Sequence, residues 1–154
     1  MNFDKYTIRA QEAVQAAVQS AQLGRQQSVE PLHLLKGIME KGKDTLNFIF
    51  QKLGANAHGV EMALQNELQH LPKVDGGQPY FSNETTQVFN QAESISQQWG
   101  DEFVSIEPLL MAIMKGNNTA GRILKDAGCT EDGMRKAIEE LRQGQQVQTQ
   151  SGDE

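Results

Sequence analysis

Histidine and cysteine are the residue types through which this sequence could build a metal site or a covalent catalyst. The three histidines, His33, His58 and His70, lie on separate segments, without the spacing or the cysteine partners of a zinc site. Cys129 is the single cysteine, and it would be a reactive nucleophile only if its surroundings lowered its pKa. We interpret it as a small side chain filling a helix junction, and we expect His33 to be half-buried and bonded to backbone. The sequence therefore predicts no catalytic residue and no metal ligand.

Three acidic residues lie around the start of one predicted helix, where their negative charges could interact with the helix dipole or with a ligand. Asp101, Glu102 and Glu107 bracket the start of a helix that we expect after Ser105. A carboxylate in the first turn of a helix interacts favourably with the helix dipole, which accounts for Glu107 by itself. The other interpretation is a polar rim on a binding surface, and the residues alone leave both open.

An internal repeat in the sequence predicts the arrangement of helices that must position these residues. Residues 29–39 align with residues 104–114 at a shift of 75, and five of the eleven positions are identical. Matches continue upstream at a shift of 76 and downstream at a shift of 74, as expected when loops gain or lose single residues. Two copies of such a unit should pack as similar helical bundles about a pseudo-twofold axis, with a binding groove at their seam.

Apolar residues at three- and four-residue spacing predict four helices in each repeat. Pro31 fits the first turn of the second helix, and Pro72 ends the fourth. The first helix should include Tyr6, and the other helices should begin at polar capping residues: Thr45, Asn56, Ser82, Ser105, Thr119 and Thr130. The sequence therefore predicts an all-α fold of eight helices without a β-strand.

The same pattern divides the chain into units. The first repeat spans 1–71, a connector with glycine and proline spans 72–81, and the second repeat spans 82–143. Residues 144–154 contain too few apolar side chains to order themselves, and we interpret them as a flexible linker to a further part of a longer protein.

Composition excludes several classes of function. The net charge is −6, and no cluster of lysine and arginine gathers on one face, which argues against nucleic acid and anionic membranes as partners. The longest apolar stretch, 109–114, is too short to span a bilayer, and a lone cysteine suits a reducing compartment. The sequence contains no G-x-x-x-x-G-K-[ST] loop for nucleotide phosphates. We expect a cytoplasmic protein that binds no cofactor within this chain.

Three segments carry a resemblance to a known family: EPLHLL at 30–35, LPKV at 71–74 followed by Gly76 and Gly77, and ILKDAG at 123–128. With the repeat and the helix order, they make residues 1–143 resemble the N-terminal domain of the Clp family of AAA+ chaperones. The connector favours the ClpB subfamily of disaggregases over the ClpA and ClpC subfamilies. The resemblance implies an eight-helix, pseudo-twofold double Clp-repeat domain, which is not an enzyme. Residues 144–154 would tether it to ATPase modules that bind ATP and Mg²⁺ and form a hexameric ring.

The resemblance also implies a groove that holds exposed apolar segments of unfolded or aggregated proteins and passes them to the ring. In the family, a threonine in the first helix and two acids near the sixth border this groove, and Thr7, Asp101 and Glu107 match those positions here. To these we add four residues as an apolar floor: Ile8, Phe89, Pro108 and Leu109. The implied partners are client polypeptides, the remainder of the same AAA+ chain and, indirectly, a chaperone system of the DnaK type.

Binding in such a groove would be weak and tolerant of sequence. Apolar side chains of the client would lose water, while the acids at the rim would bind backbone N–H groups or client lysine and arginine. An alternative within the same family is the docking of a small folded adaptor protein, as in ClpA and ClpC, which predicts a discrete polar interface. We expect the chain by itself to be a monomer, since ring contacts would belong to the ATPase modules.

Overall fold

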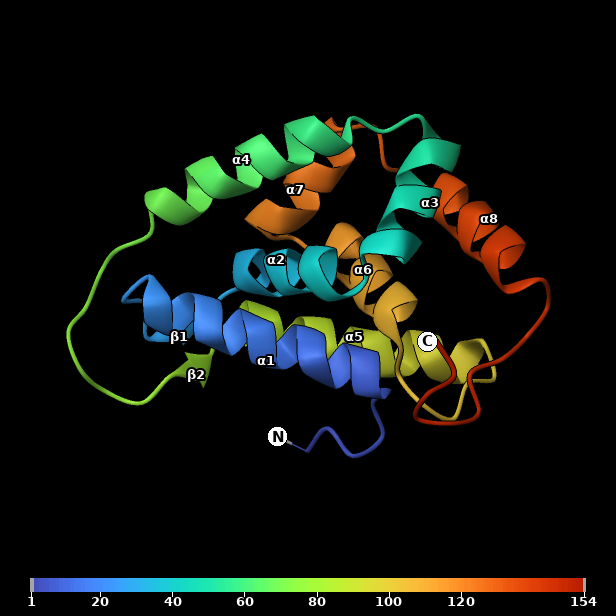
Figure 1. The fold of residues 1–154 in the computed structure, drawn as a ribbon, viewed down its shortest axis with the longest axis horizontal. Helices are drawn as coiled ribbons and strands as arrows, with labels where there is room; N and C mark the ends of the chain where they lie inside the picture. Colours follow the sequence, from blue (N-terminus) through green and yellow to red (C-terminus); the bar gives the residue numbers. More distant parts are fainter. Residues whose placement is uncertain (1, 154) are drawn as a thin grey trace.

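The computed structural model describes residues 2–153, and over this range the chain is predominantly helical (Figure 1). The outermost residues of the predicted units, 1 and 154, lie outside the described range. The all-α fold class and the number of helices predicted from the sequence are confirmed over residues 2–153. The elements, in chain order, are α1 (Ile8–Leu23), β1 (Ser28–Val29), α2 (Pro31–Lys41), α3 (Lys43–Leu53), α4 (Ala57–Gln69), β2 (Tyr80–Phe81), α5 (Asn83–Gln98), α6 (Ile106–Lys115), α7 (Thr119–Asp126) and α8 (Glu131–Arg142).

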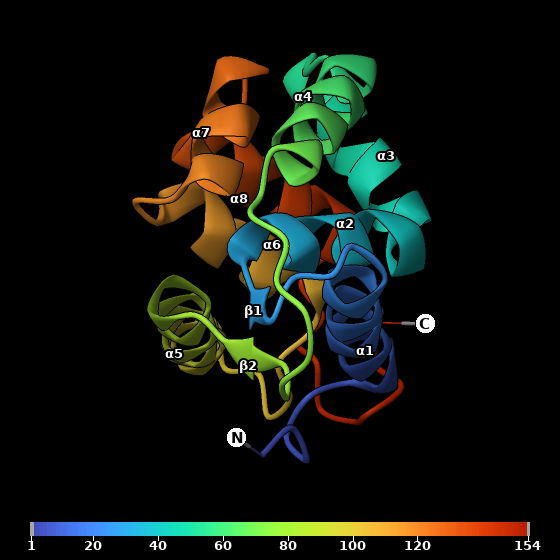
Figure 2. The ribbon, with the colours of Figure 1, turned by 90° about the vertical axis from the view of Figure 1, so that its left-hand side faces the viewer.

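The helices pack as two interlocked sets of four. Within the repeats, α1 packs along α2 and α5 packs along α6, whereas α3 contacts α8 and α4 contacts α7 across the two repeats. Figure 2 shows α1, α3 and α4 on one side and α5 and α7 on the other, with α2 and α6 between them. A twofold rotation that exchanges the repeats therefore carries the α3–α8 contact onto the α7–α4 contact.

The expectation that the chain lacks β-strands is wrong at one place. β1 and β2 form a parallel pair in which Ser28 lies opposite Tyr80 and Val29 lies opposite Phe81. Two residues are too few to show the alternating pattern by which a strand is recognised in a sequence. The pair joins the segment before α2 to the segment before α5, so it connects the two repeats.

A second backbone bridge repeats this connection on the other side of the pseudo-twofold axis. Tyr6 pairs in parallel with Val104, and a shift of 75 carries Val29 onto Val104 and Tyr6 onto Phe81. The bridge before α1 and α6 is thus the counterpart of the strand pair before α5 and α2. The sequence repeat is therefore also a repeat of backbone connections.

Most predicted helix starts agree with the structure, and the differences are local. Asn56, Ser82 and Thr130 each accept a hydrogen bond from a backbone N–H in the first turn of their helices, as expected. The predictions of Thr45 and Thr119 as caps are wrong: Gly42 and Asn118 precede α3 and α7. α3 begins three residues and α7 one residue earlier than expected, a difference that apolar spacing does not resolve.

The two repeats share one core. Gly37 of α2 lies against the backbone of α1, where a Cβ atom would collide with the carbonyl oxygen of Ala13. Alanines on α1 permit this close approach of the two helices. Three of the identical pairs are fully buried in both repeats: Leu34 with Leu109, Leu35 with Leu110 and Ile38 with Ile113.

Residues 144–153 differ from the expected unordered tail. Residues 145–148 have neither helix nor strand structure and residues 149–153 form bends and turns, and this segment lies against the N-terminal ends of α1 and α6. Val147, its one aliphatic side chain, is only 4% exposed. The composition of this segment predicted too little apolar surface to order it by itself. The rest of the domain supplies the hydrogen-bond and packing partners that order it.

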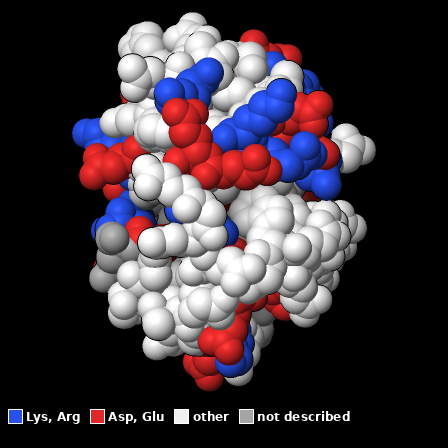
Figure 3. Space-filling view, turned by 90° about the vertical axis from the view of Figure 1, so that its right-hand side faces the viewer, with Lys and Arg blue, Asp and Glu red and all other residues white. Residues whose placement is uncertain are grey.

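On the surface over α3 and α8, acidic and basic side chains lie next to one another (Figure 3). Figure 3 shows a band in which acidic and basic side chains alternate over α3 and α8, above a mostly uncharged region. Lys52 of α3 pairs with Glu140 of α8 at 2.9 Å, and Arg135 pairs with Glu131 and Asp132 within α8. In residues 2–153 no helix combines the length and the apolar character needed to cross a membrane.

Candidate functional site

The structure brings Thr7, Asp101 and Glu107 into one region, where the N-terminal ends of α1 and α6 meet the segment after α8. Thr7 is the N-cap of α1, and Glu107 lies in the first turn of α6. Asp101 precedes α6 in the loop that follows α5. All three side chains are buried, so in this conformation none of them lies on the exposed rim of a groove.

Arg142, the last residue of α8, binds both acids. Its Nε donates to Oε1 of Glu107 at 2.8 Å, and its Nη1 donates to Oδ2 of Asp101 at 2.8 Å. The third nitrogen, Nη2, donates to the hydroxyl of Ser105 at 3.0 Å, and the guanidinium lies over the ring of Trp99. The acids that the sequence assigned to client binding are therefore paired within the chain.

Three carboxylates share this one guanidinium region. Burial raises the pKa of Glu107, and the positive charge of Arg142 opposes this effect without cancelling it, while the nearby charge of Asp153 adds to it. Burial likewise raises the pKa of Asp153, against hydrogen bonds from Thr7 and Ile106. Burial therefore disfavours the charged form of both Glu107 and Asp153.

Thr7 makes two hydrogen bonds with its hydroxyl group. It accepts from the backbone N–H of Ala10 at 3.1 Å, which caps α1, and it donates to Oδ2 of Asp153 at 3.0 Å. The same carboxylate oxygen accepts from the backbone N–H of Ile106 at 3.4 Å. Asp153 therefore joins the first residues of α1 and α6.

The backbone around these residues presents donors to the segment that covers them. The carbonyl oxygen of Val147 accepts from the N–H groups of Glu102 at 2.9 Å and Phe103 at 3.3 Å. The N–H of Ile8 donates to the carbonyl of Gln150 at 2.7 Å. These hydrogen bonds involve only backbone carbonyl groups of the covering segment, which every peptide sequence offers. The surface could therefore bind a non-helical peptide of any sequence.

The predicted apolar floor lies mostly elsewhere. Phe89, Pro108 and Leu109 are buried in the core, because their helices turn these side chains toward neighbouring helices. The ring of Phe89 lies among other aromatic rings, with centroids 5.1 Å from Phe3 and from Phe81. Of the four predicted floor residues only Ile8 is exposed, at 43%.

Sequence reasoning missed Arg142, Val147 and Asp153. A basic residue in the last turn of a helix is common for dipole reasons, so Arg142 carried no signal of a buried pairing. Val147 is one apolar residue among glutamines, and Asp153 is one acid near the end of the sequence. Only the return of the chain after α8 gives these residues their partners.

Two of the residues considered first for chemistry, His33 and Cys129, are buried. His33 accepts a hydrogen bond at Nδ1 from the backbone N–H of Glu30 at 2.9 Å, as predicted. It is fully buried, not half-buried, and burial lowers its pKa to about 4. Burial raises the pKa of the Cys129 thiol to about 11, so it stays protonated near neutral pH. Within residues 2–153, no group of three or more metal-ligating side chains is placed to hold a metal ion.

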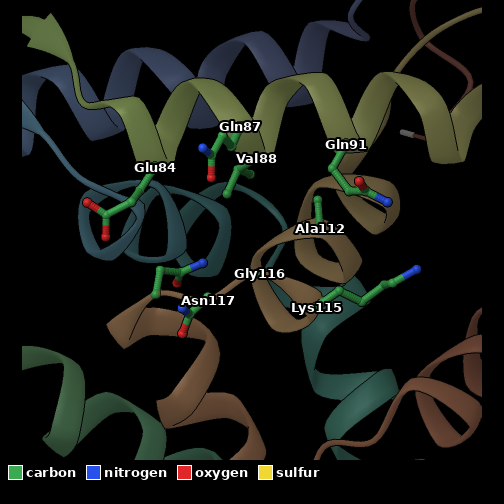
Figure 4. Close-up of a pocket in the computed structure, with 9 residues that line it drawn as sticks. Glu84, Gln87, Val88, Gln91, Ala112, Lys115, Gly116 and Asn117 are labelled. Atoms are coloured by element: carbon green, nitrogen blue, oxygen red, sulfur yellow. The ribbon is translucent and has the colours of Figure 1, made fainter.

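A separate polar cavity of about 200 Å³ opens between α5 and the turn from α6 to α7. Figure 4 shows that α5 contributes one wall, while the end of α6 and the following turn contribute the other. Its lining is rich in amide groups and carries one acid and one base: Glu84, Gln87, Val88, Gln91, Ala112, Lys115, Gly116, Asn117 and Asn118.

The fold and the site define a two-repeat α-helical binding domain. Residues 5–127 match the model of the family described as the Clp repeat (R) N-terminal domain, and the chain belongs to this family. The predicted resemblance to Clp chaperones is confirmed.

The similar curated proteins are named chaperone protein ClpB. The chain is 47% identical over 154 residues to the one from Bacteroides thetaiotaomicron and 43% identical to the one from Porphyromonas gingivalis. Each alignment covers 100% of this chain and 18% of the relative, so the chain spans about a fifth of the length of these relatives.

Solved structures share the fold at low sequence identity. The N-terminal domain of Hsp104 from Candida albicans superposes with a TM-score of 0.83 at 22% identity, covering 98% of this chain and all of that one. The N-terminal domain of ClpD from Arabidopsis thaliana has a TM-score of 0.69 at 21% identity, covering 92% of this chain and 97% of that one. These likenesses concern the fold alone.

Proposed function

We propose that this chain is the N-terminal substrate-binding domain of an ATP-dependent protein disaggregase. It engages exposed apolar segments of unfolded or aggregated proteins and delivers them to AAA+ modules of its own chain, which assemble as a hexameric ring with ATP and Mg²⁺. The relatives named ClpB and the fraction of their length that this chain spans support this proposal. A cytoplasmic location, an isolated monomer and indirect cooperation with a DnaK-type system remain predictions.

The observation that carries the proposal is the set of backbone donors at the start of α1 and before α6. The N–H groups of Ile8, Glu102 and Phe103 already bind carbonyl oxygens of a segment that lacks helix and strand structure. A client of any sequence offers the same carbonyl groups. The buried position of Val147 shows that an apolar side chain also finds room there.

The structure changes the role proposed for the acids. Asp101 and Glu107 hold Arg142, and through it they fix the loop whose N–H groups face the covering segment. A client side chain of lysine or arginine would have to compete with this buried pairing. The site therefore favours backbone carbonyls and apolar side chains over positive charge.

Binding of this kind is weak for one domain. A small apolar contact with a few hydrogen bonds corresponds to dissociation constants from micromolar to millimolar, on the order of −4 to −8 kcal/mol. Several copies in a ring would gain avidity for long clients.

An amide NMR titration with reduced, carboxymethylated lactalbumin, which is permanently unfolded, tests the proposal. Shifts should cluster at Ile8, Glu102 and Phe103. Ile8→Ser should weaken binding several-fold, while Leu23→Ser should not, although Leu23 is an exposed apolar residue at the other end of α1. Absence of shifts at the site, or equal effects of both variants, would refute the proposal.

Docking of a folded adaptor is the second candidate, and the polar cavity between α5 and the α6–α7 turn favours it. Its amides, Glu84 and Lys115 form the discrete polar surface that this function needs. Gln91→Arg would fill the cavity with a long side chain. A stoichiometric partner that binds the wild type but not this variant, with lactalbumin binding unchanged, would favour the adaptor function.

A further inference from the structure

The segment 144–153, which we call the C-terminal strap, covers the surface that we propose for clients. Its carbonyl groups take the donors of Ile8, Glu102 and Phe103, and its carboxylate at Asp153 takes the hydroxyl of Thr7. A client could not reach these donors while the strap is in place. The strap and a client therefore need the same groups.

The strap lies on this surface in the manner of a bound peptide. Val147 is buried, and its backbone N–H donates to Oδ1 of Asp101 at 3.0 Å. The alternate residues Gln146, Gln148 and Gln150 direct their side-chain amides to backbone carbonyls of the domain. One apolar side chain and exposed amide contacts make a modest attachment, because an exposed hydrogen bond gains little over water.

One feature of the strap opposes its docking. Asp153 is partly buried, and its Oδ1 atom is enclosed without a hydrogen-bond partner among the described residues. An unsatisfied buried oxygen loses its water contacts without replacement, which favours the undocked state. The strap is thus held by one apolar side chain and by hydrogen bonds of its backbone and side chains, and it is weakened by one of its own side chains.

We propose that the C-terminal strap is an intramolecular competitor of the client, which closes the site when it is empty and must leave before a client segment binds. This inference rests on the proposed function of the same site. Only molecules with an undocked strap can bind a client. The apparent affinity for a client is then the intrinsic affinity multiplied by the fraction of molecules whose strap is undocked. A change that releases the strap raises client affinity without touching any residue of the site.

Val147→Asp tests this inference, because a charge at a buried position should release the strap. Gln145→Asp is the matched control, since it adds the same charge to the strap at an exposed position. A chain ending at residue 143 is a second release variant. We expect Val147→Asp to bind reduced, carboxymethylated lactalbumin about five- to tenfold more tightly than the wild type or Gln145→Asp. In the wild type, the amide signals of 147–152 should become those of a mobile chain as the client is added.

The outcomes separate the inference from the proposed function. If NMR shows a released strap in either release variant but lactalbumin affinity is unchanged, the competition is refuted and the client function stands. If neither the wild type nor a release variant binds lactalbumin at Ile8 and Glu102, both fail. Circular dichroism of each variant confirms that the helices are retained.

Discussion

The hydroxyl of Thr7 donates a hydrogen bond to Asp153 at 3.0 Å, across 146 positions of the chain. This contact brings the start of the first helix and the end of the strap to the same place, beside the first residues of α6. It also explains why Thr7, the residue that the sequence assigned to a groove rim, is fully buried. The site is thus closed by residues from both ends of the described chain.

Replacing Arg142 should destabilise the domain strongly. Arg142→Met leaves the buried carboxylates of Asp101 and Glu107 without a positive partner, which costs about 3–5 kcal/mol in the free energy of unfolding. Urea denaturation followed by circular dichroism measures this. Arg135→Met, in the same helix but in exposed ion pairs, should cost about 1 kcal/mol or less. Equal losses for the two variants would contradict the buried pairing.

Thr7 and Ser82 are the N-caps that the repeat relates. Replacing either should lower the stability of the domain by a similar amount, but only the replacement of Thr7 should affect the strap. Thr7→Ala and Ser82→Ala each remove a capping hydrogen bond, at a cost of about 0.5–2 kcal/mol in thermal or urea unfolding. Only Thr7→Ala also removes the contact with Asp153. It should therefore increase the mobility of residues 147–152 in ¹⁵N relaxation measurements, whereas Ser82→Ala should leave their relaxation unchanged.

Acidification should tighten the strap. Burial raises the pKa of Asp153 in the docked state above its ordinary value of 3.8, so protonation favours docking. The contribution is complete below pH 3.8 and is lost as the pH rises through the raised pKa. Arg9 and Glu107 are the charged groups that influence this carboxyl, and burial raises the pKa of Glu107 as well.

Amide exchange of the Ile8 N–H reports strap docking as the pH is lowered from 7 toward 4. Its protection should increase beyond the intrinsic slowing of exchange in acid, while Asp153→Asn should remove most of this increase. The same pH dependence in Asp153→Asn as in the wild type would assign it to another group.

The close packing of α1 on α2 should make Gly37 irreplaceable. In Gly37→Ala the new methyl group meets the backbone carbonyl of Ala13, and the helices must separate, at a cost of about 1–3 kcal/mol in urea unfolding. Gly59→Ala in α4 is the control, because there the methyl group meets the side chain of Asn56 and not a backbone, so its loss is limited to the hydrogen bond by which Asn56 caps the helix. Alanine favours a helix over glycine, so a Gly37→Ala variant as stable as the wild type would contradict the close approach of α1.

Much of the fold could be predicted because its signals are local. Apolar spacing and polar caps indicated each helix, and the match of Val29 with Val104 indicated two similar repeats. A two-residue strand such as Ser28–Val29 has no period, and its pairing with Tyr80–Phe81 depends on how the repeats dock. The caps Gly42 and Asn118 were missed for a related reason, since a cap one to three residues away fits the same apolar pattern.

The sequence by itself determined that the chain is an all-α double repeat, and the resemblance to the Clp family grouped Thr7 with Asp101 and Glu107. Only the tertiary structure decided that the acids bind Arg142, that Phe89 lies in the core and that Val147 is buried. The physical reason is the range of the interactions. Helix formation depends on neighbours three or four positions away, whereas Arg142 binds acids 35 and 41 positions away, a contact that forms only when the helices have packed.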